Sequence, residues 1–161
     1  MSNACSSGGW KQLFFGEYEH TLDDKCRFIV PAKFRERLKD GCFMTRGLDG
    51  CLWIFTASSY EDLTTKLQRL DQLNPNARNL LRFLTGHDLS LDQQGRLLIP
   101  PSLRGHANVN PKADVVIVGV SGQLPRIELW QADRWSTMNE MFQNNGSAMA
   151  ESLFAAGITL S

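Results

Sequence analysis

The chain has 161 residues, of which 42% are hydrophobic, and its 17 lysines and arginines balance 17 aspartates and glutamates, so its formal net charge is zero. The length suffices for a globular core, no apolar run approaches the roughly 18 to 20 residues that span a bilayer, and the N-terminus lacks the order of a secretory signal. We therefore expect a cytoplasmic globular protein, and the neutral charge taken alone argues weakly against a nucleic-acid partner.

The N-terminal part predicts an extension followed by a hairpin. Residues 1 to 12 are rich in serine, glycine and asparagine, which is typical of a disordered segment. In Phe15 to Leu22 the side chains partly alternate, Asp23 to Cys26 has turn chemistry, and Phe28 to Val30 is a short apolar run. We therefore predict that two strands pair with each other around the turn.

A short helix and a second hairpin follow. Pro31 suits the first turn of a helix, and Phe34 and Leu38 have the four-residue spacing of one buried face. Residues 42 to 45 and 51 to 55 are rich in apolar side chains and are separated by a glycine-containing turn. This pattern predicts a hairpin.

Two helical stretches come next. Apolar residues at helical spacing predict one amphipathic helix after the second hairpin and a connecting helix over residues 74 to 85. We interpret both stripes as faces that pack on a core rather than as a cofactor site. The stripes are Tyr60, Leu63, Leu67 and Leu70, and then Ala77, Leu80, Leu81 and Leu84.

The second half of the chain repeats the first. Residues 22 to 35 align with residues 91 to 104 without a gap, and leucine, aspartate, arginine, proline and the final arginine coincide. Residues 46 to 55 likewise resemble residues 118 to 130, so the strands, turns and short helix are predicted a second time. Two copies of one unit make up most of the chain.

The repeat defines the predicted organisation. Asn144 to Ser147 indicates a break after the second copy, and Met149, Leu153 and Phe154 then predict a short amphipathic helix. The predicted parts are a disordered extension over residues 1 to 12, a first repeat over 13 to 73, a connecting helix over 74 to 85, a second repeat over 86 to 142, and a C-terminal amphipathic helix and tail over 143 to 161.

Residue types that serve catalysis or metal binding are scattered. There is no CxxC pair and no HExxH-like arrangement, so we expect reduced thiols and no metal site. Asp23, Asp24 and Asp92 are the only nominees for an acid or base, and no nucleophile or phosphate-cradling glycine loop accompanies them. The sequence therefore does not predict an enzyme. The cysteines are Cys5, Cys26, Cys42 and Cys51, and the histidines are His20, His87 and His106.

The motifs of both copies occur in a specific order. In chain order they are Gly16-Glu17-Tyr18, Asp23-x-x-x-Arg27, Ile29 to Arg35, Thr45 to Leu52, and Asp92-x-x-x-Arg96 with Leu97 to Pro100. From about Phe15 to Ile158 the chain resembles the bacterial MraZ family. A single Asp-x-x-x-Arg motif would be a weak signal, but the pair in this order is specific.

The resemblance implies an α+β fold, mainly β, in which two tandem AbrB-like units form a swapped-hairpin, double-psi-like β-barrel with helices packed outside. It also implies a ring-like homo-oligomer that regulates transcription by binding tandem repeats of double-stranded DNA upstream of the division and cell-wall gene cluster. The implied location is cytoplasmic and nucleoid-associated. No cofactor, metal ion, membrane or small-molecule substrate is expected.

The candidate DNA-binding residues lie in the two repeated turns. Arginine can contact phosphates and can bond guanine in two places, so Arg27 and Arg96 are the first choices. Asp23 and Asp92, four residues earlier, can hold the guanidinium groups in place. Lys25 adds a cation to the first turn only, and we expect it to contact phosphate.

The sequence leaves several alternatives open. Each Asp-Arg pair could be only an intramolecular clasp. The neutral charge favours a second class of function, an AbrB-like interaction module or scaffold without specific DNA binding. The cations Lys33, Arg35 and Arg37 could extend a DNA surface, although a charge run on a short helix is usually a solvated face.

Cys26 raises a separate question. The second copy has Gly95 at the equivalent position, and a turn that needs a positive φ disfavours cysteine by about 1 kcal/mol or more, so the first turn could differ in shape. A reactive thiolate beside Lys25 and Arg27 is conceivable, with plain packing as the alternative.

Overall fold

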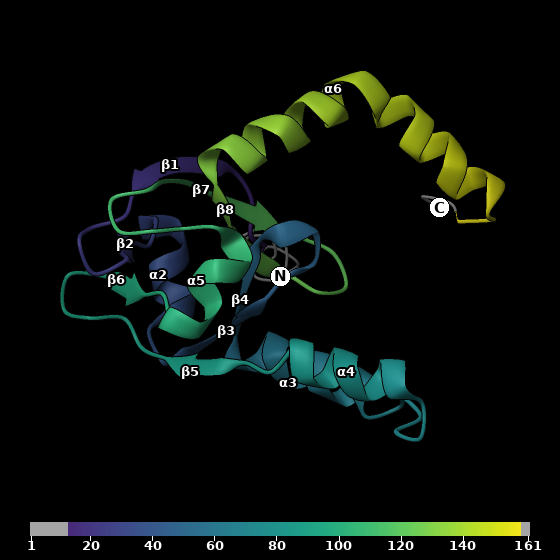
Figure 1. The fold of residues 1–161 in the computed structure, drawn as a ribbon, viewed down its shortest axis with the longest axis horizontal. Helices are drawn as coiled ribbons and strands as arrows, with labels where there is room; N and C mark the ends of the chain where they lie inside the picture. The colour runs from purple at the N-terminus through teal and green to yellow at the C-terminus, as the bar shows by residue number, and fades with distance from the viewer. Residues whose placement is uncertain (1–12, 159–161) are drawn as a thin grey trace, which may run out of the picture. The chain divides into compact units, whose positions relative to one another are not determined.

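The computed structural model describes residues 13 to 158, which form two compact units, one ending at Gln131 and one beginning at Ala132. The predicted N-terminal extension lies outside the described residues. The elements of the first unit are β1 (Glu17–Thr21), β2 (Arg27–Ile29), α2 (Ala32–Leu38), β3 (Cys42–Arg46), a 3-10 turn (Leu48–Gly50), β4 (Leu52–Thr56), α3 (Ala57–Leu67), α4 (Pro75–Phe83), β5 (His87–Leu89), β6 (Arg96–Leu98), α5 (Pro101–Ala107), β7 (Asp114–Val120) and β8 (Arg126–Gln131) (Figure 1).

The strands of the two sequence repeats interleave. Six of them form an antiparallel sheet in the order β1-β7-β8-β4-β3-β5, and β2 pairs with β6 in a separate two-stranded ribbon. The inner hairpins β3-β4 and β7-β8 are each formed within one repeat, as the sequence predicts. The other pairs join one repeat to the other, because β1 lies on β7, β5 on β3 and β4 on β8.

The predicted first hairpin of each repeat is therefore wrong in its pairing. The strands are present where the alternation and the apolar run place them, but β1 pairs with β7 and β2 pairs with β6. The reason is that the sharp turn between β1 and β2 directs the two strands into different sheets, where each finds an antiparallel partner from the other copy.

The predicted closed barrel is also wrong. In the described part of the chain, β1 and β5 are the two edges of the six-stranded sheet and do not pair with each other, so the sheet is antiparallel and open. The mainly-β α+β class is confirmed. The exchange of hairpins that the resemblance implies stays a prediction.

One hydrophobic core serves both repeats. Phe34 and Leu38 of α2 enter it together with Leu103 and Ala107 of α5, the equivalent helix of the second copy. Gly105 lies inside α5 and does not shorten it, since both helices have 7 residues. The two copies therefore contribute equivalent helical faces to a shared interior.

A buried carboxylate also ties the repeats together. Glu128 of β8 lies opposite Trp53 of β4 and accepts hydrogen bonds from the indole nitrogens of Trp53 at 3.0 Å and Trp130 at 2.9 Å. Arg126 donates to the same carboxylate at 2.9 Å and stacks over the ring of Trp53. Because a buried charge is costly unless it is paired, this network fixes the β4-β8 register.

The second unit consists mainly of one helix, α6 (Ala132–Ala155), which has 24 residues. It runs without interruption through Asn144 to Ser147, so the predicted break is wrong. Asparagine, serine and glycine lower helix stability by at most about 1 kcal/mol each, which the helix-forming residues on either side offset. No helix within residues 13 to 158 is long and apolar enough to cross a membrane.

Candidate nucleic-acid interface

The two Asp-x-x-x-Arg motifs meet at the β2-β6 ribbon. The strands pair antiparallel along their whole length around the central pair Phe28 and Leu97. Both central side chains are buried and point into the core. The neighbouring side chains on each strand consequently point to the opposite, outward face of the ribbon.

The outward face has an approximate twofold pattern. Arg27 lies opposite Leu98, and Ile29 lies opposite Arg96. Ile29 and Leu98 are 45% and 43% exposed, although both are large apolar residues. Two partly exposed arginines and two exposed aliphatic side chains thus form one small surface made equally by both repeats.

The first turn is closed by Asp23. One carboxylate oxygen accepts hydrogen bonds from the backbone N–H groups of Lys25 at 2.9 Å and Arg27 at 2.8 Å, and the other accepts from Arg27 Nε at 2.6 Å. The backbone of the turn is closed as well, because the N–H of Cys26 donates to the carbonyl of Asp23. The aspartate therefore fixes the turn and the arginine side chain together.

The second turn repeats this geometry. Asp92 accepts from the backbone N–H groups of Gln94 and Arg96, each at 2.9 Å, and from Arg96 Nε at 2.8 Å. The Gly95 N–H donates to the Asp92 carbonyl, as Cys26 does in the first turn. The predicted Asp-Arg clasp is thus present in both copies.

The two turns have the same shape despite the different residues at their tips. Cys26 has a φ of 58° and Gly95 a φ of 78°, so both occupy the left-handed region. The alternative that cysteine gives the first turn a different shape is therefore wrong. Cys26 is fully buried in the core, which favours packing over a reactive thiol.

The clasps change the acidity of the aspartates. Burial alone would raise the pKa of Asp23, but hydrogen bonds from the backbone and guanidinium of Arg27 and from the backbone of Lys25 outweigh it and lower that pKa. The backbone N–H of Arg96 is the main cause of the lowered pKa of Asp92, with the Arg96 side chain adding to it. Both aspartates are therefore anions at neutral pH.

The motifs are linked to each other, and not symmetrically. Arg96 Nη1 lies 3.7 Å from the carboxylate of Asp23, and Arg96 Nη2 donates to the side chain of Gln94. The terminal nitrogens of Arg27 have no hydrogen-bond partner in residues 13 to 158. Arg27 can therefore offer its terminal nitrogens to a ligand, whereas those of Arg96 are partly engaged.

Two of the remaining cations of the first copy, Arg35 and Arg37, do not form part of a solvated charge run. The Lys25 side chain is exposed at the tip of the first turn. On α2, Arg37 stacks over the ring of Phe14 at 3.6 Å, and Lys33 lies over Phe15 at 5.2 Å. Arg35 is partly buried and donates to a backbone carbonyl. The solvated-face interpretation is thus wrong for Arg35 and Arg37.

Arg35 entered the sequence prediction only as one of three cations that could extend a DNA surface, and Arg104 was not among the predicted site residues. Arg35 Nε donates to the carbonyl of Val30 at 2.7 Å, and Arg104 Nε donates to the carbonyl of Ile99 at 2.9 Å. A signal was available, because these arginines close the gapless alignment of the two copies, each four residues after a proline.

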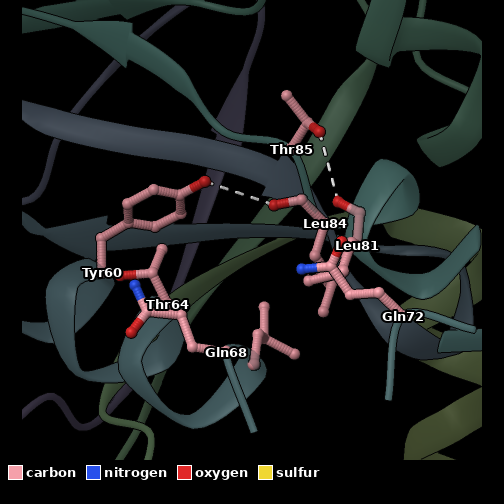
Figure 2. Close-up of a pocket in the computed structure, with 8 residues that line it drawn as sticks. Tyr60, Thr64, Gln68, Gln72, Leu81, Leu84 and Thr85 are labelled. Atoms are coloured by element: carbon pink, nitrogen blue, oxygen red, sulfur yellow. Dashed lines mark hydrogen bonds between the residues drawn. The ribbon is translucent and has the colours of Figure 1, made fainter. Parts of the chain in front are cut away.

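A pocket of about 240 Å³ lies elsewhere, between α3 and α4. Figure 2 shows Tyr60, whose hydroxyl donates to the Leu84 carbonyl, at one side of it. All of its lining side chains are uncharged, and none belongs to the Asp-x-x-x-Arg motifs. The described residues also contain no group of three or more side chains that could hold a metal ion.

The chain is similar to known proteins over nearly the whole of its described length. The family model for the MraZ protein, which is described as antitoxin-like, matches twice, over residues 13–83 and 83–155. A protein of Ligilactobacillus salivarius named transcriptional regulator MraZ is 44% identical over 143 residues, which cover 88% of this chain and 96% of that one. A protein of the same name from Herpetosiphon aurantiacus is 40% identical over 148 residues, covering 91% and 100% of the two chains. Another from Clostridium acetobutylicum is equally similar over the same coverage.

Proposed function

The chain belongs to the MraZ family, and from this premise we propose that it binds specific sequences of double-stranded DNA through the β2-β6 ribbon and its two turns. Relatives in this family are transcriptional regulators, so the chain is a regulator of transcription and not an enzyme. The observation that carries the proposal is the joining of both Asp-x-x-x-Arg clasps in one outward-facing ribbon.

The shape of the ribbon supports this assignment. The major groove of DNA admits a two-stranded β-ribbon, and arginine bonds the O6 and N7 atoms of guanine with two nitrogens. Arg27 leaves its terminal nitrogens available for such a contact, while Asp23 fixes the rest of its guanidinium group. Fixing the side chain in advance reduces the conformational entropy that binding would cost.

The first turn carries more of the phosphate contact in this proposal. Lys25 is exposed at its tip, whereas the second copy has the neutral Gln94 there, held by Arg96. Phosphate contacts position a protein on DNA, and base contacts specify the sequence. We assign Lys25 to the phosphate role and Arg27 to base reading, with Arg96 as the weaker reader.

Assembly and organisation form the wider part of the proposal. A ring-like homo-oligomer presents several ribbons, which can bind tandem promoter repeats upstream of the division and cell-wall gene cluster at the same time. The overall affinity then exceeds that of a single ribbon by about a hundredfold or more where the geometry permits. The units are AbrB-like repeats over residues 13 to 73 and 86 to 142, joined by a connecting helix over 74 to 85. The protein would act in the cytoplasm, on the nucleoid.

A second candidate is an interaction module that uses the same fold without specific DNA binding. The net charge of zero favours it, since DNA-binding surfaces are usually basic. Under this alternative the aspartate-arginine pairs are only clasps that close the turns.

The deciding experiment measures binding of the purified protein to duplex DNA from its own upstream region at two salt concentrations. We expect affinity to fall steeply as salt rises. Arg27→Ala should weaken specific binding by about tenfold to a hundredfold, and Arg96→Ala by less. If neither arginine matters while the oligomer persists, the clasps are structural and the interaction-module candidate holds.

A further inference from the structure

We infer that Arg35 and Arg104 are positioning residues of the DNA interface, each holding the turn that belongs to the other repeat. This inference rests on the proposed function, because it assumes that the two turns contact DNA. It adds two residues that the Asp-x-x-x-Arg motifs do not contain.

Arg104 connects α5 to the first turn. Its Nε donates to the carbonyl of Ile99 at 2.9 Å, just before Pro100, which precedes α5. Its Nη2 donates to the carbonyl of Lys25 at 3.5 Å, although Lys25 is 79 residues earlier in the chain. A side chain of the second repeat thus bridges its own strand end and the tip of the first repeat's turn.

Arg35 occupies the corresponding place in the first repeat and packs against the second turn. Its Nε donates to the carbonyl of Val30 at 2.7 Å, just before the proline that precedes α2. A Cβ atom on Gly95 would lie 2.9 Å from Arg35 Nε, so the arginine side chain lies directly against the second turn. The glycine at the tip of that turn makes room for it.

Backbone hydrogen bonds complete each connection. The N–H of Ile99 donates to the carbonyl of Cys26 at 3.0 Å, and the N–H of Val30 donates to the carbonyl of Gly95 at 2.9 Å. Val30 and Ile99 therefore each accept a hydrogen bond from an arginine at the carbonyl and donate one to the turn of the other repeat through the N–H. Removal of the guanidinium would loosen the strand end and the turn attached to it.

Both arginines carry a charge, so each could contact phosphate instead of positioning a turn. The salt dependence of binding distinguishes the two roles. A phosphate contact contributes about 0.9 to the slope of log affinity against log salt concentration. A positioning residue weakens specific binding when it is changed but leaves that slope as it is. Lysine keeps the charge but lacks the planar guanidinium with which Arg104 bridges two carbonyl groups and with which Arg35 packs against Gly95.

The test is a pair of double-mutant cycles on duplex DNA from the chain's own upstream region. We expect Arg104→Lys to weaken specific binding about tenfold, the effect of losing one or two hydrogen bonds, with an unchanged salt slope. Added to Arg27→Ala, the Arg104→Lys change should weaken specific binding little further. Added to Arg96→Ala, it should weaken specific binding as much as it does in the wild type. Arg35→Lys should show the reverse preference, coupling to Arg96 and not to Arg27.

A matched control is Arg78→Lys. Arg78 also donates to two carbonyls, those of Gln72 and Leu73, but it lies on α4, away from the ribbon. This variant should bind DNA like the wild type. Circular dichroism and the oligomeric state must match the wild type for each variant, and if one arginine variant fails to fold the other cycle still decides.

The outcomes separate this inference from the proposed function. If the wild type does not bind the duplex specifically, the proposed function fails. If it binds but both lysine variants bind normally, or their effects add equally to Arg27→Ala and Arg96→Ala, only the positioning inference is overturned. A salt slope that falls by about 0.9 in Arg104→Gln, with Arg104→Lys normal, would reassign Arg104 to a phosphate contact.

Discussion

At the scale of single residues, Cys26 combines two opposed contributions to stability. Its left-handed backbone costs about 1 to 2 kcal/mol in an L-residue, while its side chain is fully buried in the core. Gly95 fills the same place in the other turn without that cost, because it has no Cβ. The first turn keeps its shape because the Asp23 clasp and the core around it together outweigh the strain.

Cys26→Val tests this balance. A β-branched side chain is a poor fit to the left-handed region, so we expect the free energy of unfolding to fall by about 2 kcal/mol or more. Cys26→Gly relieves the backbone strain but loses buried surface and gains unfolded-state entropy, so it should stay within about 1 kcal/mol of the wild type. Urea unfolding of both variants measures the difference, and a valine variant as stable as the wild type would contradict the strain.

The aspartate clasps predict how stability depends on pH. The pKa values of Asp23 and Asp92 are lowered in the folded protein. Their contribution is therefore fully present above the unfolded pKa, near 3.8, and is lost as the pH falls through the lower folded values. Thermal unfolding from pH 7 to about pH 2 should show a steeper loss of Tm below pH 4 in the wild type than in an Asp23→Asn and Asp92→Asn double variant. Parallel curves would mean that the clasps contribute nothing.

The site was predictable only in part for reasons of distance along the chain. The Asp-x-x-x-Arg spacing is local, so the sequence alone predicts that each aspartate can hold its arginine. The bridge from Arg104 to Lys25 joins residues far apart in sequence, and no periodicity shows it. Arg35 lies in a run of cations on a short helix, and such a run usually predicts a solvated face rather than a contact with a turn.

At the scale of elements, the strands were predictable, but four of the six strand pairs were not. β3-β4 and β7-β8 are joined by short turns, and turn chemistry predicts such pairs. For β1 and β2 the turn is equally sharp, but their pairing is decided by how each strand packs on the core that both repeats share. That choice depends on non-local packing, which propensity does not encode.

The N-terminal segment crosses β7 at a position that only glycine allows. A Cβ on Gly119 would lie 2.2 Å from the backbone nitrogen of Phe15. The same segment is held by hydrogen bonds from Gly119 N–H to the Gly16 carbonyl and from the Ser121 hydroxyl to the carbonyl of Phe14, whose ring is fully buried. Backbone meets backbone here, so neither side can move aside as a flexible side chain would.

Gly119→Ala should therefore destabilise the protein by about 1 to 3 kcal/mol, the usual cost of overpacking a core. Gly105→Ala is the matched control, since a Cβ there meets nothing within 4 Å and the residue is inside α5. It should raise stability by up to about 1 kcal/mol through helix propensity. Denaturant midpoints of the two variants give the comparison, and equal effects of the same sign would refute the steric argument.

At the scale of the whole molecule, the duplicated sequence does not form two separate domains. Internal similarity predicts two copies, but strands of both copies are interleaved in one sheet, and each copy supplies the partner for the other's first strand. Glu128 adds a buried link, because it accepts hydrogen bonds from Trp53 of the first copy and Trp130 of the second. The core and the candidate DNA ribbon are both products of the two copies together.

It follows that neither copy should fold alone. In a fragment of residues 13 to 73, β1 and β2 have no partner strands and only the β3-β4 hairpin is complete, and an isolated hairpin is marginally stable at best. We expect this fragment and one of residues 86 to 158 to lack a cooperative unfolding transition by circular dichroism. Mixing them should restore the transition, because β1-β7, β2-β6 and β3-β5 can then pair between chains. A cooperative transition in residues 13 to 73 alone would show that the copies are independent, and the ribbon would then have to form between subunits rather than within one.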